Sequence, residues 1–310
     1  MNPLVRRALR ACALFVLRAC ALLAVCAIPA SHAQQPAAKP EYVFEPVIGM
    51  PGKDVVWVPT PPAVVELMLD MAKVTASDFV IDLGSGDGRI VIAAAKRGAK
   101  GFGVDLNKDL VQLSNEEAAR LGLSDRAQFL VKDMFQTDLS PASVLTTYLL
   151  PHLNVRVRPQ LLRQMKPGSR VVTYSFHMGE WQPDAVAQVN GLTVHYWVVP
   201  ARAMGTWRWH HDGIGFTREY EMKVQQKFQF ISGTASAKTS IAYLRDMKLE
   251  GDRITFALTE EAGSALAQTR YEGRIDGDTI TGTARMNNQT EARPWRAQRV
   301  AGRTDIEVVK

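Results

Sequence analysis

Short apolar runs and amphipathic stretches alternate along the middle of the chain, up to about residue 211. The apolar runs are continuous, which is typical of strands that are buried on both faces of a parallel sheet. The amphipathic stretches end at glycine or proline, as helices do. We therefore expect an α/β fold with a doubly wound sheet, closed at one end by an antiparallel pair of strands. The pattern predicts strands at 78–83, 101–106, 127–131, 143–150 and 170–176, and the closing pair at 192–199 and 206–210. It predicts helices that begin at Thr60-Pro61 and cover 89–97, 107–120 and 159–165, with Asn107 as the N-cap of the third.

Beyond about residue 215, strand-like segments follow one another without helices. An internal similarity at a spacing of 26 residues relates 249–255 to 275–281, and in both segments Gly-Asp separates two strand-like runs. Runs joined at such a tight turn form hairpins, and successive hairpins form a meander. Residues 215–310 are therefore predicted to be a smaller all-β domain, either a barrel or a sandwich. The predicted strands are 219–231, 241–249, 253–258, 269–275, 279–285 and 294–298.

The first 33 residues differ from the rest of the chain. Arginines precede an apolar run over residues 19–30, and residues 30–33 read Ala-Ser-His-Ala. This layout is typical of a secretory signal peptide, so we expect cleavage after Ala33 and an exported, periplasmic or membrane-tethered protein. A cytoplasmic location would follow if the start of the chain is misassigned. Residues 34–54 are predicted to be a Pro-rich linker, which leaves residues 55–214 for the α/β domain.

Removal of the first 33 residues changes the meaning of the charge and of the cysteines. The full chain has 37 Lys and Arg residues against 31 Asp and Glu, a formal net charge of +6. Four of the basic residues and all three cysteines lie in this segment, so the rest of the chain is near +2 (33 − 31) and has no cysteine. We therefore expect no nucleic-acid partner, no disulfide and no cysteine-ligated metal. His210-His211 is not predicted to bind a metal either, because neighbouring strand residues point to opposite faces.

The candidate chemistry is concentrated in a glycine-rich segment that follows the first predicted strand and opens a helix. Its glycines allow a sharp turn and let a ligand approach the backbone closely. The acid at the end of the strand is unfavourable for a bound diphosphate, but it suits a ligand that carries an ammonium or a sulfonium. The candidate cofactor-binding residues in this segment are Asp82, Gly84, Ser85, Gly86, Asp87 and Gly88.

Two further acids end the next two predicted strands. Asp105, followed by Leu106, lies where a carboxylate can accept both ribose hydroxyls of a nucleoside. Asp133 follows the third strand and could reach an adenine amino group, with Met134 against the face of the ring. One acid for an amino-acid end, one for a ribose and one for a base describe S-adenosylmethionine (SAM). This chemistry requires no metal.

These motifs resemble those of the class I, seven-strand SAM-dependent methyltransferases, and the resemblance covers roughly residues 55–211. The segment Met-Lys-Pro-Gly-Ser-Arg-Val-Val at 165–172 is similar to the turn before the family's fifth strand. More closely, Trp-Val-Pro-Thr-Pro at 57–61 and the glycine-rich segment through residue 92 resemble the small seven-strand protein-lysine methyltransferases. The resemblance implies a methyltransferase that uses SAM, with a protein lysine amine as the leading acceptor.

The acceptor side is less defined. Tyr-Leu-Leu-Pro at 148–151 stands where amino-methylating relatives carry a substrate-facing motif, but it lacks the Asn/Asp-Pro-Pro-Tyr form of many nucleic-acid and glutamine methylases. That departure makes a DNA or RNA base less favoured. The resemblance implies an in-line displacement, for which the protein mainly supplies alignment. The candidate substrate-side residues are Tyr148, Pro151 and His177.

Phe176 and Trp181 lie near the same strand ends. Core packing is the alternative interpretation for Tyr148 and Phe176, and the preferred one for Trp181. The acceptor is left open between a protein and a small molecule. A different hypothesis is a non-catalytic protein that binds SAM or a nucleoside and engages a partner through its β domain. The sequence predicts no oligomeric state.

Overall fold

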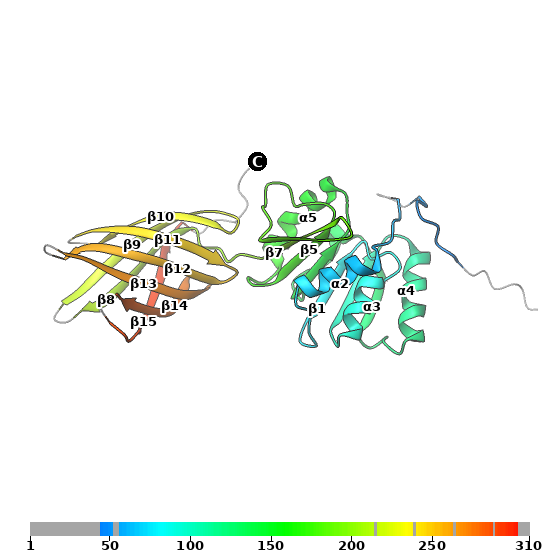
Figure 1. Ribbon diagram of the computed structural model, residues 1–310, viewed down its shortest axis with the longest axis horizontal. Helices are drawn as coiled ribbons and strands as arrows, with labels where there is room; N and C mark the ends of the chain where they lie inside the picture. Colours follow the sequence, from blue (N-terminus) through cyan, green and yellow to red (C-terminus); the bar gives the residue numbers. More distant parts are fainter. Residues whose placement is uncertain are drawn as a thin grey trace, which may run out of the picture. The chain divides into compact units, whose positions relative to one another are not determined.

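The computed structural model describes residues 44–51, 56–213, 216–237, 240–262, 265–287 and 289–302. The predicted signal peptide, its cleavage site and much of the Pro-rich linker lie outside these residues. The described chain forms a seven-stranded mixed sheet covered by helices, followed by a closed barrel of antiparallel strands (Figure 1). Within the described ranges, no helix has the length and the apolar character needed to cross a bilayer.

The sheet has the strand order β3-β2-β1-β4-β5-β7-β6. Strands β1 to β5 pair in parallel, and β7 runs antiparallel to both of its neighbours. This arrangement confirms the predicted α/β fold with a doubly wound sheet. The strands are β1 (Phe79–Leu83), β2 (Lys100–Asp105), β3 (Ala127–Val131), β4 (Val144–Thr147), β5 (Arg170–Tyr174), β6 (Ala185–Val189) and β7 (Leu192–Val198).

The antiparallel end of the sheet differs from the prediction. The segment 206–210 does not join this sheet but lies in β8 (Gly205–Gly213) of the barrel. Its place is taken by β6, an edge strand whose residues are all exposed or half-buried, so that an apolar pattern does not reveal it. A strand with alternating burial has the same sequence pattern in either sheet, so the pattern could not show to which sheet β8 belongs.

Helices cover both faces of the sheet (Figure 1). On one face, α2 (Pro62–Met71) and α3 (Arg89–Lys96) share a buried cluster with valines of β1, β4 and β5. On the other face, α5 (Pro151–Gln164) packs against Ile81, Leu145 and Val171. The remaining helix, α4 (Lys108–Arg120), begins after Asn107, whose side chain accepts hydrogen bonds from the first turn as predicted.

Two helices begin at residues other than those predicted. Helix α2 begins at Pro62, one residue after Pro61, and has no side-chain cap. Helix α5 begins at Pro151 instead of Pro159, because the preceding strand already ends at Thr147. A proline in the first turn costs no helical hydrogen bond, whereas Pro159 inside the helix removes one. Burial of the helix's apolar side against the sheet offsets that loss.

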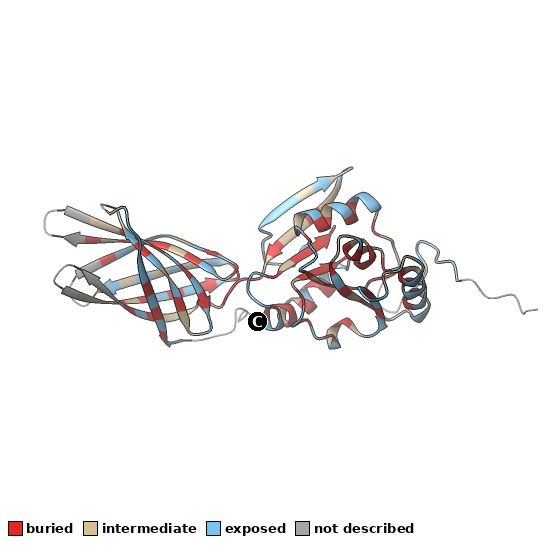
Figure 2. Ribbon diagram, turned by 90° about the horizontal axis from the view of Figure 1, so that it is seen from below, coloured by how far each residue is buried: buried red, intermediate tan, exposed pale blue. Residues whose placement is uncertain are grey.

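The second sheet is a closed barrel with the order β10-β11-β12-β13-β14-β15-β8-β9, in which β9 also pairs with β10. It confirms the predicted all-β domain as a barrel. Buried and exposed residues alternate along its strands (Figure 2), and Trp209, Phe256, Tyr271 and Trp295 pack together inside. The strands beyond β8 are β9 (Phe216–Lys227), β10 (Phe230–Ala237), β11 (Ser240–Glu250), β12 (Arg253–Ala262), β13 (Ala265–Asp276), β14 (Thr279–Met286) and β15 (Arg293–Ala301).

The turns of the barrel are partly as predicted. Gly251-Asp252 and Gly277-Asp278 join the two predicted hairpins, β11–β12 and β13–β14. The predicted strand 219–231 is in fact two strands, since the chain reverses at Phe228-Gln229 between β9 and β10. The predicted division between residues 214 and 215 falls between β8 and β9, which are paired strands of one barrel.

Trp181 lies in the core, where the β9–β10 turn meets the α/β fold. Its side chain is 0% exposed and stacks on Phe228, with the ring centroids 5.9 Å apart. Its Nε1 donates a hydrogen bond of 3.0 Å to Oε1 of Gln229. The packing interpretation of Trp181 is therefore the one that the structure supports.

Candidate active site

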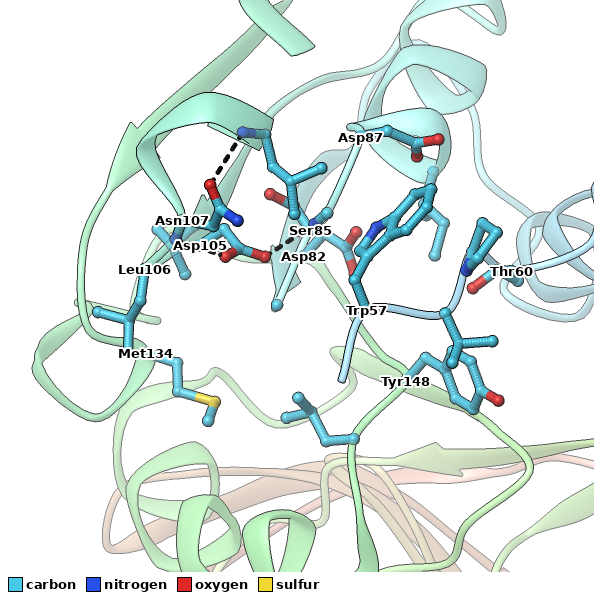
Figure 3. Close-up of a pocket in the computed structure, with 18 of the residues that line it drawn as sticks. Trp57, Thr60, Asp82, Ser85, Asp87, Asp105, Leu106, Asn107, Met134 and Tyr148 are labelled. Carbon is cyan, nitrogen blue, oxygen red and sulfur yellow. Dashed lines mark hydrogen bonds between the residues drawn. The ribbon is translucent and has the colours of Figure 1, made fainter. Parts of the chain in front are cut away.

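A cavity of about 260 Å³ lies at the carboxyl ends of β1, β2 and β4 (Figure 3). Ligands of open α/β sheets bind at this edge. The cavity walls come from the glycine loop after β1, the ends of β2 and β3, the segment after β4, and residues 56–60, which we call the strap. Of the predicted cofactor residues, Asp82, Gly84, Ser85, Gly86, Asp87, Asp105, Leu106 and Met134 line the cavity, and Gly88 and Asp133 do not.

The glycine loop requires glycine for two reasons. Gly84 and Gly86 have φ angles of +74° and +54°, in the left-handed region that residues with a side chain seldom adopt. A Cβ on Gly86 would also lie 2.7 Å from Nε1 of Trp57, a strap residue that packs against the loop. The loop and the strap therefore fit together only when residue 86 has no side chain.

Asp82 is a carboxyl group buried at the base of the cavity. It is 2% exposed, and its Oδ1 accepts a hydrogen bond of 2.7 Å from Oγ1 of Thr146. Within the described residues it has no ion-pair partner. Burial raises the pKa of Asp82 to about 7, and the nearby carboxylates of Asp105 and Asp87 add to the rise. A ligand cation placed beside Asp82 would reverse this shift, because it stabilises the carboxylate.

Asp105 joins the end of β2 to the glycine loop. Its Oδ2 accepts a hydrogen bond of 3.0 Å from the backbone N of Gly86, and its Oδ1 accepts one of 2.8 Å from the backbone N of Asn107. A carboxylate has about four acceptor positions, so each oxygen keeps capacity for a ligand hydroxyl. Leu106 and Met134 lie on the same side of the cavity (Figure 3) and offer apolar surface for a ring.

Asp87 lines the cavity, but its charge is already balanced. Its carboxylate accepts a hydrogen bond of 2.8 Å from Nε of Arg89 and forms an ion pair with the same guanidinium. Nη1 of Arg89 donates a hydrogen bond of 2.7 Å to the backbone O of Thr60. Arg89 thus ties the glycine loop to the strap, which makes the role of Asp87 one of positioning the two walls.

Gly88 and Asp133 serve the local fold in the described structure. Gly88 is the N-cap of α3 with a φ of +79°. Asp133 is the N-cap of a short 3-10 helix, η1 (Met134–Gln136): its Oδ1 accepts from the backbone N of Phe135, and its Oδ2 accepts from Nε2 of Gln136. A contact between Asp133 and an adenine amino group stays a prediction.

An aromatic group stands on the other side of the cavity. The ring of Tyr148 lies 4.2 Å from that of Tyr174 and 6.4 Å from that of Phe176, measured between centroids. Burial, followed by the neighbouring Tyr174, raises the pKa of Tyr148, so that its hydroxyl stays protonated at neutral pH. Tyr148 and Phe176 both line the cavity, so the substrate side has an aromatic wall.

A strained turn holds Phe176 in this wall. Ser175 follows β5 with a φ of +67°, and such backbone strain is commonest at functional sites. The backbone O of Phe176 accepts a hydrogen bond of 3.3 Å from Nδ2 of the buried Asn154 and a second one from Oγ1 of Thr173. Asn154 in turn is bonded to Thr147 at the end of β4. Polar side chains beneath the wall thus fix its position.

The other substrate-side candidates do not reach the cavity. Pro151 is exposed at the start of α5, and His177 is exposed with its Nδ1 accepting from the backbone N of Gly179. Neither lines the cavity, and a substrate contact of Pro151 or His177 stays a prediction. Among the residues that the structure describes, no three His, Cys, Asp or Glu side chains gather in a form that could hold a metal ion.

Two important residues were not among the sequence candidates. Thr146 supplies the hydrogen bond to Asp82, and Trp57 covers the glycine loop. Strand β4 is buried at every position and ends in two threonines, and buried hydroxyls need hydrogen-bond partners, so these threonines could have indicated a polar partner nearby. Trp57 stands in a Pro-rich segment without periodicity, and only its resemblance to relatives marked it.

The cofactor side as a whole suits a nucleoside that carries a cation. Asp82 is a buried carboxyl group without an ion-pair partner in the described chain, and Asp105 offers acceptors for hydroxyls. The buried Oγ of Ser85, another lining residue, has no hydrogen-bond partner among the described residues. Buried polar atoms are rarely left without a partner, so a ligand at this point is favoured. These residues fit SAM.

Known proteins share this part of the chain. A family model described as the ANTKMT methyltransferase domain matches residues 82–185. A protein-lysine N-methyltransferase of Saccharolobus islandicus is 38% identical over 144 residues, which are 46% of this chain and 89% of that protein. The adenine nucleotide translocase lysine N-methyltransferase of Mus musculus is 34% identical over 127 residues, 41% of this chain and 55% of that protein, so the chain spans about half the length of this relative. A crystal structure of an RNA methyltransferase from Salinibacter ruber with S-adenosyl-L-homocysteine is 45% identical, covers 46% of this chain and 94% of its own, and has a TM-score of 0.45.

Proposed function

Because the chain belongs to the class I SAM-dependent methyltransferases and uses S-adenosylmethionine as its cofactor, we propose that it methylates the side-chain amine of a lysine in a protein. The observation that carries this proposal is the uncharged, aromatic wall made by Tyr148 and Phe176. Tyr148 lies across the cavity from Asp105 and Met134 (Figure 3). The names of the relatives from Saccharolobus islandicus and Mus musculus point to the same acceptor.

The cofactor side would hold SAM through residues already described. Asp82 would accept the ammonium of its amino-acid end, Asp105 the ribose hydroxyls, and Leu106 and Met134 would flank the base. When bound, SAM would supply a methyl group that its sulfonium has activated, so that the nitrogen of a neutral amine could bond to the methyl carbon while the electron pair of the broken S–C bond stays on the departing sulfur. The protein's task is to align the amine with the methyl group and to keep water away.

The aromatic wall favours a lysine for a physical reason. A lysine must lose a proton before its nitrogen can attack, and burial in an uncharged surrounding lowers the pKa of a lysine amine. The wall therefore favours the neutral amine without a carboxylate beside it, and the lysine releases its proton to solvent as it enters the cavity.

The acceptor class can be tested with the full-length protein. It would be incubated with SAM carrying an isotopically labelled methyl group and an extract of its own cells, and the label would be sought in protein, RNA and small-molecule fractions. We expect methylated lysine after acid hydrolysis of the protein fraction. An Asp105→Ala variant, which removes two hydrogen bonds from the cofactor wall, is the control for background label. Label confined to RNA or to small molecules would refute the proposal.

We also propose that residues 1–33 direct export and are removed. The support is the sequence pattern alone, since these residues lie outside the described structure. N-terminal sequencing of the protein from its native cell would test this, and an intact Met1 would refute it. An exported enzyme of this kind would need SAM outside the cytoplasm, so SAM should also be assayed in that compartment.

A further inference from the structure

Large apolar side chains are exposed around the opening of the active-site cavity. Val56, Val58 and Leu150 line the cavity and are nevertheless 57%, 41% and 39% exposed. Val47 and Ile48 do not line the cavity, but they are exposed in the turn whose next residues, Gly49 and Met50, are hydrogen-bonded to Trp57 of the strap. We call these five residues the apolar rim. Single exposed apolar residues need no explanation, but a group of them at the opening of a cavity marks a binding surface.

The rim is held in place by its surroundings. The backbone N of Gly49 donates a hydrogen bond of 2.9 Å to the backbone O of Trp57, and the backbone N of Trp57 donates one of 3.0 Å to the backbone O of Met50. Trp57 packs on Gly86 of the cofactor loop, and Thr60 accepts a hydrogen bond from Arg89. The strap is therefore tied to the catalytic domain by the contact of Trp57 with Gly86 and by the hydrogen bond at Thr60, and the turn before the strap is bonded to Trp57.

Charge is distributed unequally over the cavity. The charged lining residues all belong to the end of β1, the glycine loop, the start of α3 and the ends of β2 and β3: Asp82, Asp87, Arg89, Asp105 and Lys132. The strap and the segments after β4 and β5 contribute only uncharged lining residues. This uncharged half has no acid that could attract a lysine by its charge. Affinity for the segment that carries the lysine must then come from contacts with its neighbours.

The rim and the uncharged half form one continuous surface, because Val56, Val58 and Leu150 belong to both. Building on the proposed lysine acceptor, we infer that the rim docks a protein segment whose target lysine is flanked by large apolar side chains. The enzyme selects its lysine by apolar neighbours rather than by acidic ones. Removal of one well-buried valine or leucine contact corresponds to about a tenfold change in an equilibrium constant.

The test uses the full-length protein, SAM and two peptides of equal length with one central lysine each. In one peptide leucine and valine flank the lysine, and in the other serine and glutamate do. We expect kcat/KM to favour the apolar peptide by about tenfold or more, and its KM to be unchanged between low and high salt, since apolar contacts are not screened. Equal rates, or preference for the acidic peptide, would overturn the inference.

Variants locate the contact. Val56→Ser and Leu150→Ser should each raise KM for the apolar peptide by about tenfold, with a smaller rise for the peptide flanked by serine and glutamate. Val186→Ser is the matched control, because Val186 is 53% exposed on β6 and does not line the cavity. If Val56→Ser and Leu150→Ser behave as Val186→Ser does, the inference is wrong. The inference is also wrong if Val56→Ser and Leu150→Ser keep the KM for the apolar peptide but lose binding to lipid vesicles or lose self-association.

The outcomes separate this inference from the proposed function. Methylation of both peptides at equal rates would leave the lysine acceptor standing and remove only the role of the rim. Methylation of neither peptide, together with label on RNA or small molecules from the cell extract, would remove the lysine acceptor itself.

Discussion

The buried Asp82 predicts a substitution that stabilises the protein while abolishing cofactor binding. Asp82→Asn keeps an oxygen that can accept the hydrogen bond from Thr146. It removes a group whose pKa rises from the ordinary value of 3.8 to about 7. At 1.36 kcal/mol per pKa unit, the difference of (7 − 3.8) corresponds to about 4 kcal/mol. This is the free energy by which the ionised carboxylate destabilises the cofactor-free fold.

The sign depends on pH. Below pH 3.8 the carboxyl group is protonated in both the folded and the unfolded chain, and its titration does not change the stability. As the pH rises, the unfolded chain ionises first, and the wild type loses stability relative to the variant until about pH 7. We therefore expect Asp82→Asn to be more stable by up to about 4 kcal/mol at pH 8 and to approach the wild type near pH 4.

Urea unfolding without SAM, followed by tryptophan fluorescence at pH 4.5 and pH 8, measures this difference. Calorimetry with SAM at pH 8 should show binding to the wild type only, because the amide cannot balance the ammonium. A stability difference that is the same at both pH values would refute the reasoning, as would a variant that is less stable than the wild type at pH 8. In the first case the carboxyl group would not be the titrating group, and in the second the amide would be poorly accommodated.

Three further predictions concern the same wall of the cavity. SAM affinity of the wild type should fall by about tenfold per pH unit below pH 7, because Asp82 must lose a proton to receive the ammonium, and calorimetry over pH 5.5–8 would show it. Asp105→Ala should abolish SAM binding while leaving the circular dichroism spectrum unchanged; unchanged affinity would contradict the ribose role. Gly86→Ala should weaken SAM binding at least tenfold, because residue 86 has a φ of +54° and the added methyl group would collide with Trp57. It should also shift the tryptophan emission, whereas the control Gly122→Ala, at a glycine with open space around it, should not.

Local signals predicted much of the fold and half of the site. The glycine loop, the acids that end β1 and β2, and the Asn107 cap depend on neighbours within a few residues, so the sequence contains the relevant information. The contact between Thr146 and Asp82 joins residues 64 positions apart, and no local pattern specifies which distant side chains meet. The same limit applies to Trp57, which packs against Gly86, 29 positions further along the chain.

Where local signals were ambiguous, the rest of the fold decided. Pro151 and Pro159 both permit a helix start, and the early end of β4 selects Pro151. Asp133 follows the end of β3, much as Asp82 and Asp105 lie at the ends of β1 and β2, yet its side chain caps η1. Strand β8 has the alternation of any half-buried strand, and only its pairing with β9 and β15 places it in the barrel.

The division of charge within the cavity has a consequence for catalysis. A carboxylate beside the acceptor would stabilise a lysine ammonium, raise its pKa and lower the fraction of the neutral amine that can attack. A carboxylate beside the cofactor's ammonium does not lower that fraction, because this ammonium takes no part in the attack. The protein places its buried acid, Asp82, in the wall shared with the glycine loop and leaves the strap and Tyr148 uncharged. The stability lost at Asp82 is thus confined to the cofactor-free state. Under the proposed lysine acceptor, burial among uncharged side chains would shift the amine toward its neutral form, and the proton would pass to solvent.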